Sequence, residues 1–150
     1  MEFEQSFELP VAREAVWEFV MDVHRVAQCI EGVERLEVKS DDEFEGTLAV
    51  KMGPVKLAFE GTVTVTFRDR EQWSAGLLAA ARDRKAGGGF AAELSLTLVE
   101  LQSELTRVDV GLSTSLTGRM GQLGRPLIKK RVEKMLADFG NTVLERGVEQ

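Results

Sequence analysis

Residues 116–144 read LTGRMGQLGRPLIKKRVEKMLADFGNTVL and form the one long helix-forming segment of the chain. Three glycines and a proline fall in its first part, whereas the remainder has the residue spacing of a conventional amphipathic helix. At about 1.5 Å per residue the segment would extend for roughly 40 Å, long enough to cross a small domain. We therefore expect the rest of the chain to form a surface that this helix covers.

Turning successive residues by about 100° places the apolar side chains of the second part on one face. This helix stripe consists of Ile128, Val132, Met135, Leu136, Phe139 and Val143. Continued backward it meets Gly124, Gly121 and Gly118, while Met120, Leu123 and Leu127 fall on another face. Either the helix breaks near Pro126, or the glycines face the sheet and leave room beneath them. Both geometries open the fold at one end, so we expect residues 116–127 to contain a ligand gate.

The preceding chain alternates apolar and polar residues in stretches that are typical of half-buried strands. The predicted strands span residues 3–9, 33–38, 44–52, 55–68, 73–81, 90–101 and 107–113, with two short helices, interrupted near Asp22, after the first strand. The fourth strand exceeds the usual length, so we expect a kink or a bulge at Gly61. An antiparallel sheet with one apolar face needs a cover. The sequence therefore predicts an α+β fold, a curved antiparallel seven-stranded sheet wrapped around a long C-terminal helix.

Composition limits the function. A chain of 150 residues with 43% hydrophobic content is expected to form a single domain over residues 1–150. The net charge of -6 argues against nucleic-acid binding, which needs a basic surface. The single cysteine, Cys29, excludes an internal disulfide, and no apolar run approaches the roughly 20 residues of a membrane span. We expect a cytoplasmic protein, and leave open peripheral contact with the inner membrane.

Several short motifs together resemble the carbon monoxide dehydrogenase G-subunit (CoxG) family, within the START-like helix-grip superfamily (SRPBCC) of polyketide cyclases and lipid-transport domains. They are Val16-Trp17-Glu18-Phe19 with Asp22, Cys29-Ile30-Glu31-Gly32-Val33-Glu34, Lys51-Met52-Gly53-Pro54-Val55, Phe59-Glu60-Gly61, Gly87-Gly88-Gly89 and residues 117–124. Glu31 departs from the family pattern, which has proline there. Some members continue into a proline-rich tail that can reach a membrane, whereas this sequence stops at Gln150, so tethering by such a tail is not expected. The resemblance implies a helix-grip fold and an accessory role to a molybdenum-containing carbon monoxide dehydrogenase or a related hydroxylase.

Catalytic chemistry is not indicated by the residues themselves. The inward strand positions are almost all apolar, with Gln5 the exception, and His24 and Cys29 lie in no nucleophile motif. Gly87–Gly89 connects two strands and precedes no helix, so it reads as a hairpin turn and not as a phosphate loop. The acidic residues lack the spacing of a calcium loop. We expect a protein that is not an enzyme and holds no metal or cofactor.

The apolar inward positions are the remaining candidates for a site. Large side chains with small ones between them, at Gly46, Gly61, Ala75, Ala79 and Ala92, can leave a cavity for an apolar ligand, although a solid core remains the alternative. The predicted ligand-binding residues are Leu57, Phe59, Val63, Leu77, Phe90, Leu94, Leu96, Gly121, Gly124, Leu127, Ile128 and Met135. A second predicted surface, for anionic lipid or a partner, consists of Arg119, Met120, Leu123, Lys130, Arg131 and Lys134. A solvated basic face is the alternative for that patch.

These features favour a binding protein for a hydrophobic small molecule, held under the C-terminal helix. Our sharper hypothesis is a membrane lipid such as a respiratory quinone, carried between the bilayer and the dehydrogenase. Two alternatives remain: a cyclase- or hydrolase-like enzyme, and a module that recruits maturation factors to the dehydrogenase. The oligomeric state, including a homodimer, stays open.

Overall fold

Seven antiparallel strands form one curved sheet that wraps around a C-terminal helix in the computed structural model, which describes residues 1–52, 54–85, 87–118, 121 and 124–147. The strands are β1 (Glu2–Leu9), β2 (Val33–Val38), β3 (Glu43–Met52), β4 (Val55–Asp69), β5 (Ser74–Asp83), β6 (Gly89–Gln102) and β7 (Leu105–Thr117). Their order across the sheet is β1-β7-β6-β5-β4-β3-β2. The helices are α1 (Arg13–Val20), α2 (Val23–Gln28), α4 (Arg125–Thr142) and a π-helical turn, η1 (Val143–Gly147).

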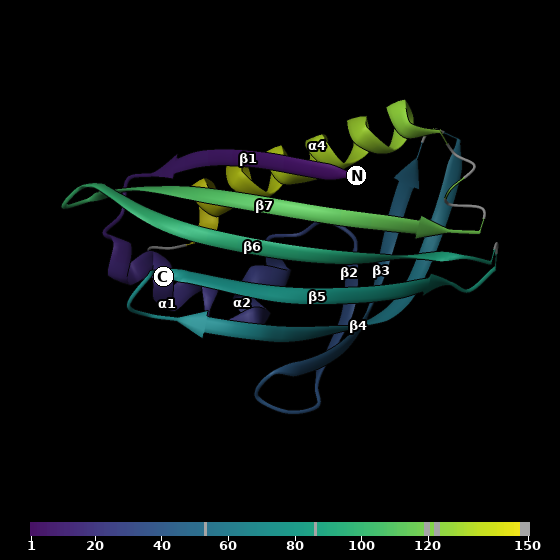
Figure 1. Ribbon diagram of the computed structural model, residues 1–150, viewed down its shortest axis with the longest axis horizontal. Coiled ribbons are helices and arrows are strands. Elements are labelled where there is room, and N and C mark those ends of the chain that lie inside the picture. The colour runs from purple at the N-terminus through teal and green to yellow at the C-terminus, as the bar shows by residue number, and fades with distance from the viewer. Residues whose placement is uncertain (53, 86, 119–120, 122–123, 148–150) are drawn as a thin grey trace.

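Consecutive strands pair as hairpins from β2 to β7, and β1 returns to pair with β7 (Figure 1). The predicted α+β architecture is therefore confirmed, including the seven strands and the two short helices after the first strand. The predicted interruption near Asp22 is also found, because Asp22 is the N-cap of α2 and its carboxylate accepts a hydrogen bond from the Arg25 amide at 3.2 Å.

The long strand β4 links two parts of the sheet. Its first part pairs with β3 and its later part with β5, and the strand changes direction along its length (Figure 1). Gly61 pairs with both Gly46 and Ala81, and a Cβ atom at Gly61 would collide with the Ala80 carbonyl oxygen. Close approach of the strands therefore requires glycine there. The register irregularity lies between Val65 and Phe67, farther along than the bulge predicted for Gly61.

Helix α4 closes the fold by contacting both sides of the curved sheet. Near its start, Arg131 Nε donates a hydrogen bond to the Lys51 carbonyl oxygen of β3 at 2.9 Å. Near its end, Phe139 packs edge-on against Phe7 of β1, with ring centroids 6.2 Å apart. Because β1 and β3 lie on opposite sides of the sheet, a helix that contacts both can only lie across its concave face.

The start of α4 differs from the single long segment predicted over residues 116–144. Strand β7 continues to Thr117, so Leu116 lies in a strand and the prediction of helix there is wrong. The helix itself begins at Arg125, with Gly124 as N-cap at φ +88° and Pro126 in the first turn. Proline suits that position because the first turn needs no amide donor. Of the two geometries left open by the sequence, the break near Pro126 is the one found.

Candidate ligand cavity

A cavity of about 460 Å³ lies between α4 and the concave face of the sheet. Helices α1 and α2 contribute further lining, through Val16, Phe19, Val20, Val23 and Val26. Native interiors are usually packed without voids much larger than a water molecule. This volume falls in the range of about 300–1,000 Å³ that small-molecule pockets occupy, so a solid core is not what these residues form.

The helical side of the cavity is the stripe that the sequence analysis placed on one face of the C-terminal helix. All of its residues line the cavity: Ile128, Val132, Met135, Leu136, Phe139 and Val143. The agreement follows from regular geometry, since α4 is uninterrupted from Arg125 to Thr142 and residues three and four apart share a face.

The sheet side combines large and small inward residues. The predicted site residues Phe59, Val63, Leu77, Phe90, Leu94 and Leu96 line the cavity, as do the small residues Gly46, Gly61, Ala75, Ala79 and Ala92. Ala79 pairs with Val63 on β4 and with Ala92 on β6, so short side chains adjoin across two strands. The space above them is not filled by their own atoms. Contact of these residues with a ligand stays a prediction.

Four predicted site residues lie elsewhere. Leu57 is buried in a hydrophobic cluster but is absent from the described cavity lining, as is Leu127, which packs against the same cluster. Gly121 and Gly124 are exposed and are absent from the described lining. Because the chain turns at Gly124 before α4 begins, these glycines do not continue the stripe over the cavity. Gly124 also has positive φ, so a larger residue there, as in Gly124→Leu, would strain the backbone as well as occupy space near the predicted gate.

Several lining residues were missed by sequence reasoning. They include Phe7 and Leu9 on β1 together with Val108, Val110, Leu112 and Leu116 on β7. The alternation that identified the strands also marks these positions as inward, except Leu116, which lies beyond the predicted end of the last strand. Alternation alone does not tell which strands of a curved sheet lie opposite the helix, so this signal was insufficient.

Two hydrophobic clusters flank the cavity. The larger cluster contains the buried residues Leu9, Val16, Trp17, Phe19, Cys29, Ala75, Leu98, Val108, Val110 and Val143. The smaller cluster, at the start of α4, contains the buried residues Val50, Leu57, Phe59 and Ile128, with Phe90, Leu116 and Leu127 packed against it. Phe59 and Phe90 meet edge to face with centroids 5.0 Å apart. The predicted gate region therefore adjoins an apolar cap at the end of the cavity.

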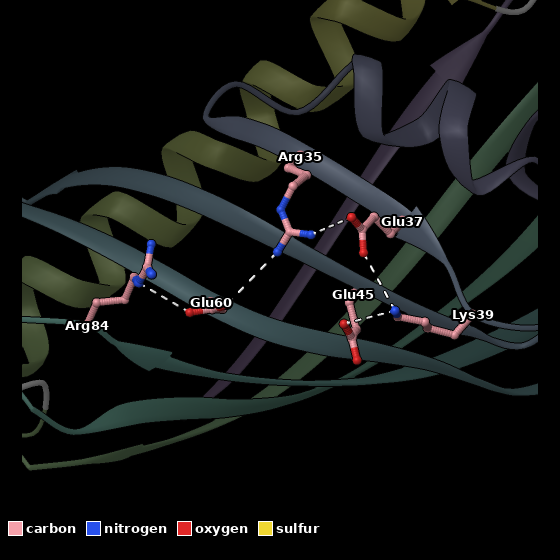
Figure 2. Close-up of polar contacts among 6 residues, drawn as sticks. All are labelled: Arg35, Glu37, Lys39, Glu45, Glu60 and Arg84. Atoms are coloured by element: carbon pink, nitrogen blue, oxygen red, sulfur yellow. Dashed lines mark ion pairs between the residues drawn. The ribbon is translucent and has the colours of Figure 1, made fainter.

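Charged groups on the sheet lie mainly on its outer face. Figure 2 shows the network across β2, β3 and β4, formed by Arg35, Glu37, Lys39, Glu45, Glu60 and Arg84. Arg35 lies 2.9 Å from Glu37, and this hydrogen bond and the charge of Arg35 lower the pKa of the Glu37 carboxyl. Arg35 and Arg68 are among the residues around the cavity, but Arg68 bonds Asp42 in the β2–β3 connection. Both guanidinium groups are therefore paired with surface carboxylates.

The predicted cationic patch is only partly described. Arg119, Met120 and Leu123 lie outside the described residues. Lys130 is exposed, Lys134 pairs with Asp138 at 2.6 Å, and Arg131 is engaged with the β3 backbone. Of this predicted set, Lys130 is the described cation that remains available to an external anion.

The other candidate groups have ordinary surroundings. His24 is exposed on α2, and Cys29 is buried in the larger cluster. Gly87 and Gly88 adopt positive φ in the β5–β6 hairpin, as a turn requires. In the described part of the chain, no three His, Cys, Asp or Glu side chains gather as a metal site would need. Among the described helices, none has both the length and the apolar character needed to cross a bilayer.

Comparison with known proteins identifies the fold and the family. The family model for the carbon monoxide dehydrogenase G-subunit (CoxG) matches residues 6–146. A conserved protein from Geobacillus kaustophilus is similar in structure, with TM-score 0.87 and 22% identity over 97% of this chain and 93% of that chain. A START superfamily protein from Mycobacterium smegmatis has TM-score 0.74 and 14% identity, over 99% and 97% of the two chains.

An enzyme shares the same fold. The Zhui aromatase/cyclase from Streptomyces sp. R1128 has TM-score 0.63 and 17% identity, over 97% of this chain and 92% of that chain. No curated protein matches the sequence. At these identities the structural likeness shows the fold alone, while family and fold together suggest binding of a hydrophobic ligand. Because the family model covers nearly the whole chain, this protein belongs to the carbon monoxide dehydrogenase G-subunit (CoxG) family, with a START-like helix-grip fold.

Proposed function

We propose that this protein is a non-enzymatic carrier of a hydrophobic small molecule, a membrane lipid or respiratory quinone, and acts as accessory to a molybdenum-type carbon monoxide dehydrogenase or a related hydroxylase. The observation that carries the proposal is the cavity of about 460 Å³ under α4, bounded by the helix stripe and by apolar inward positions of the sheet. Binding of an apolar ligand in an apolar cavity of this kind is favourable, because it removes apolar surface from water.

The cavity volume limits the size of the enclosed part of a ligand. At roughly 30 Å³ for each water-sized group, 460 Å³ accommodates about 15 such groups. A quinone ring with its first isoprenoid unit is of that size, and a longer chain would have to extend beyond the cavity. The proposal therefore concerns a ring or short acyl portion held inside, with any longer tail outside.

The non-enzymatic part of the proposal is supported by the ionisable groups around the cavity. Among the described lining residues these are Arg35 and Arg68. Arginine stays protonated and cannot act as a general base, and both side chains already pair with carboxylates. A cyclase-like activity remains the alternative, because an aromatase/cyclase shares the fold.

Contact with an anionic membrane surface is supported by cations at one end of the molecule. Lys51 and Lys56 pair across the β3–β4 hairpin, and Arg131 bonds the Lys51 carbonyl oxygen, which brings the start of α4 to this hairpin. Arg125, Lys129 and Lys130 of α4 are exposed there. Figure 1 shows the start of α4 and the β3–β4 and β5–β6 hairpins at the same end. Each basic residue near an anionic bilayer contributes about 1 kcal/mol, so this end would face the membrane despite the overall charge of -6.

The ligand is tested by native mass spectrometry and organic extraction of the purified protein, followed by titration with a short-chain quinone. We expect a co-purified lipid or saturable quinone binding that Ala79→Leu abolishes by filling the cavity. Protein that yields no lipid on extraction and has no affinity for quinones or lipids would overturn the proposal.

The membrane contact is tested by sedimentation with vesicles. Wild-type protein should bind vesicles that contain anionic lipid and not neutral vesicles, and Lys129→Glu with Lys130→Glu should reduce this binding. Equal binding to both vesicle types would remove the electrostatic part of the proposal.

The accessory role is tested by reconstitution with a molybdenum-type carbon monoxide dehydrogenase. Quinone supplied on this protein should be reduced faster than quinone supplied in vesicles alone. Equal rates would argue against delivery to that enzyme.

A further inference from the structure

Gln5 is a polar side chain in an apolar row. It occupies an inward position of β1, between the inward residues Phe3 and Phe7, and pairs with Val110 of β7. Phe3 is buried, Phe7 packs against the larger cluster, and Gln5 itself is half-buried and lines the cavity. An apolar residue of the same length would suit a purely structural role at this position better, since burying an amide without a hydrogen bond destabilises a fold.

The Gln5 amide has no hydrogen-bond partner among the described residues of the protein. The neighbouring outward residue is different, because Ser6 Oγ donates to Asp109 at 2.7 Å. The nitrogen and oxygen of Gln5 also remain accessible, since they are not among the fully buried unpaired atoms. Thr114 Oγ1, another polar group of the lining without a hydrogen bond, is fully buried and so is not exposed to the cavity.

Among the described lining residues, no charged group is left to balance a charged ligand. The described lining contains no Asp, Glu, His or Lys, and its two arginines pair with carboxylates outside. A carboxylate or phosphate placed here would lose its hydration without gaining a counter-charge, which costs several kcal/mol. A neutral polar group loses much less and can recover that loss through a single hydrogen bond.

We propose that Gln5 determines ligand specificity, by hydrogen-bonding the carbonyl or hydroxyl group of an uncharged amphiphile whose apolar part fills the cavity. The inference rests on the proposed function and narrows its ligand to this class. The amide nitrogen donates to a carbonyl, and the amide oxygen accepts from a hydroxyl. One residue therefore serves both a quinone and its quinol, whereas hydrocarbons and fatty-acid anions are disfavoured.

The test compares two probes of the same shape, a methylated naphthoquinone and methylnaphthalene, which lacks the carbonyl groups. The variant Gln5→Met keeps the side-chain length and removes the amide. We expect Gln5→Met to weaken naphthoquinone binding about five- to tenfold and to leave methylnaphthalene binding unchanged or tighter. Gln102→Met, at an exposed position of β6, is the matched control and should change neither.

The readouts separate this inference from the proposed function. If wild-type protein binds both probes and Gln5→Met affects them equally, the role of Gln5 is overturned while the ligand-binding function stands. If wild-type protein binds neither probe and carries no lipid, the role of Gln5 and the ligand-binding function are both overturned. If the Gln5 amide had only a structural role, ligand-free Gln5→Met would be less stable to urea than wild-type protein. The proposal instead expects equal or higher stability, because the substitution removes an unpaired polar group.

Discussion

The two hydrophobic clusters at the ends of the cavity differ in what supports them. The larger cluster joins α1 and the end of α4 to β1, β6 and β7, and Phe19, Leu98 and Val16 are at most 2% exposed within it. The smaller cluster has four buried residues in the described part of the chain and is covered from the helical side by the first turns of α4. From this difference we expect that one end of the cavity anchors the fold and that the other is a cap that opens at lower cost in free energy.

Aromatic and cationic side chains reinforce the anchored end. Trp73, the residue before β5, contacts two guanidinium groups, with Arg13 at 4.1 Å and Arg70 at 3.6 Å from the centroid of its ring. Trp17 of α1 meets Trp73 edge to face at 5.9 Å. Cation–π contacts contribute roughly 0.5–2 kcal/mol each, so the β4–β5 hairpin is held firmly on α1.

Leu98→Ala should have the largest effect. Leu98 is 2% exposed and lies outside the cavity lining, so its truncation leaves a void within the larger cluster. We expect a loss of about 4 kcal/mol in the free energy of unfolding, measured by urea denaturation. A smaller loss of stability in Leu98→Ala than in Leu57→Ala would contradict the assignment of the larger cluster as the anchored end.

Leu57→Ala makes the same chemical change in the smaller cluster. Leu57 is 5% exposed and also lies outside the described lining. We expect a loss of about 2 kcal/mol, because the site can relax toward the adjacent cavity. Naphthoquinone dissociation, followed through the fluorescence of Trp17 and Trp73, should accelerate severalfold in Leu57→Ala and not in Leu98→Ala. Equal acceleration in both variants would mean that the cap is not the exit.

Ala79→Leu fills the space between the clusters. Three added carbons enter a cavity and not a packed core, so stability should change by less than about 1.5 kcal/mol while ligand affinity falls at least tenfold. Isothermal titration measures the affinity. Ala91→Leu, on the outer face of neighbouring β6, is the matched control and should bind ligand normally.

Asp109→Asn should have the smallest effect on the free energy of unfolding. The ion pair between Asp109 and Arg107 lies on the outer face of β7, behind the larger cluster. Arg107 donates to both Asp109 oxygens at 2.9 and 3.1 Å, and this hydrogen bonding, with that from Ser6, lowers the pKa of Asp109. A lowered folded-state pKa stabilises the protein above about pH 4 and loses that contribution as pH falls below it. After solvent screening we expect about 0.5 kcal/mol at pH 7, compared by urea denaturation with pH 3, where the two proteins should converge.

Regular elements were predictable because their periodicity is local. The stripe from Ile128 to Val143 was found by rotation alone, since α4 has no break after Pro126. Strand β7 was predicted too short because the inward position after Leu112 is Thr114, which interrupts the apolar alternation before Leu116 resumes it. Gly121 and Gly124 lie outside the described cavity lining because their face was extrapolated through a helix that begins only at Arg125, while a gate in residues 116–127 stays a prediction.

The sequence by itself determined the strands, the amphipathic helix, the family and the apolar character of the inward positions, because each depends on neighbours within a few residues or on motifs in order. Only the tertiary structure decided that Leu57 seals a cluster while Phe59, two residues away, also faces the cavity. It also decided that Gln5 is left without a protein partner among the described residues. Both outcomes depend on how strongly the sheet curves around α4, which is set jointly by contacts between residues far apart in the chain.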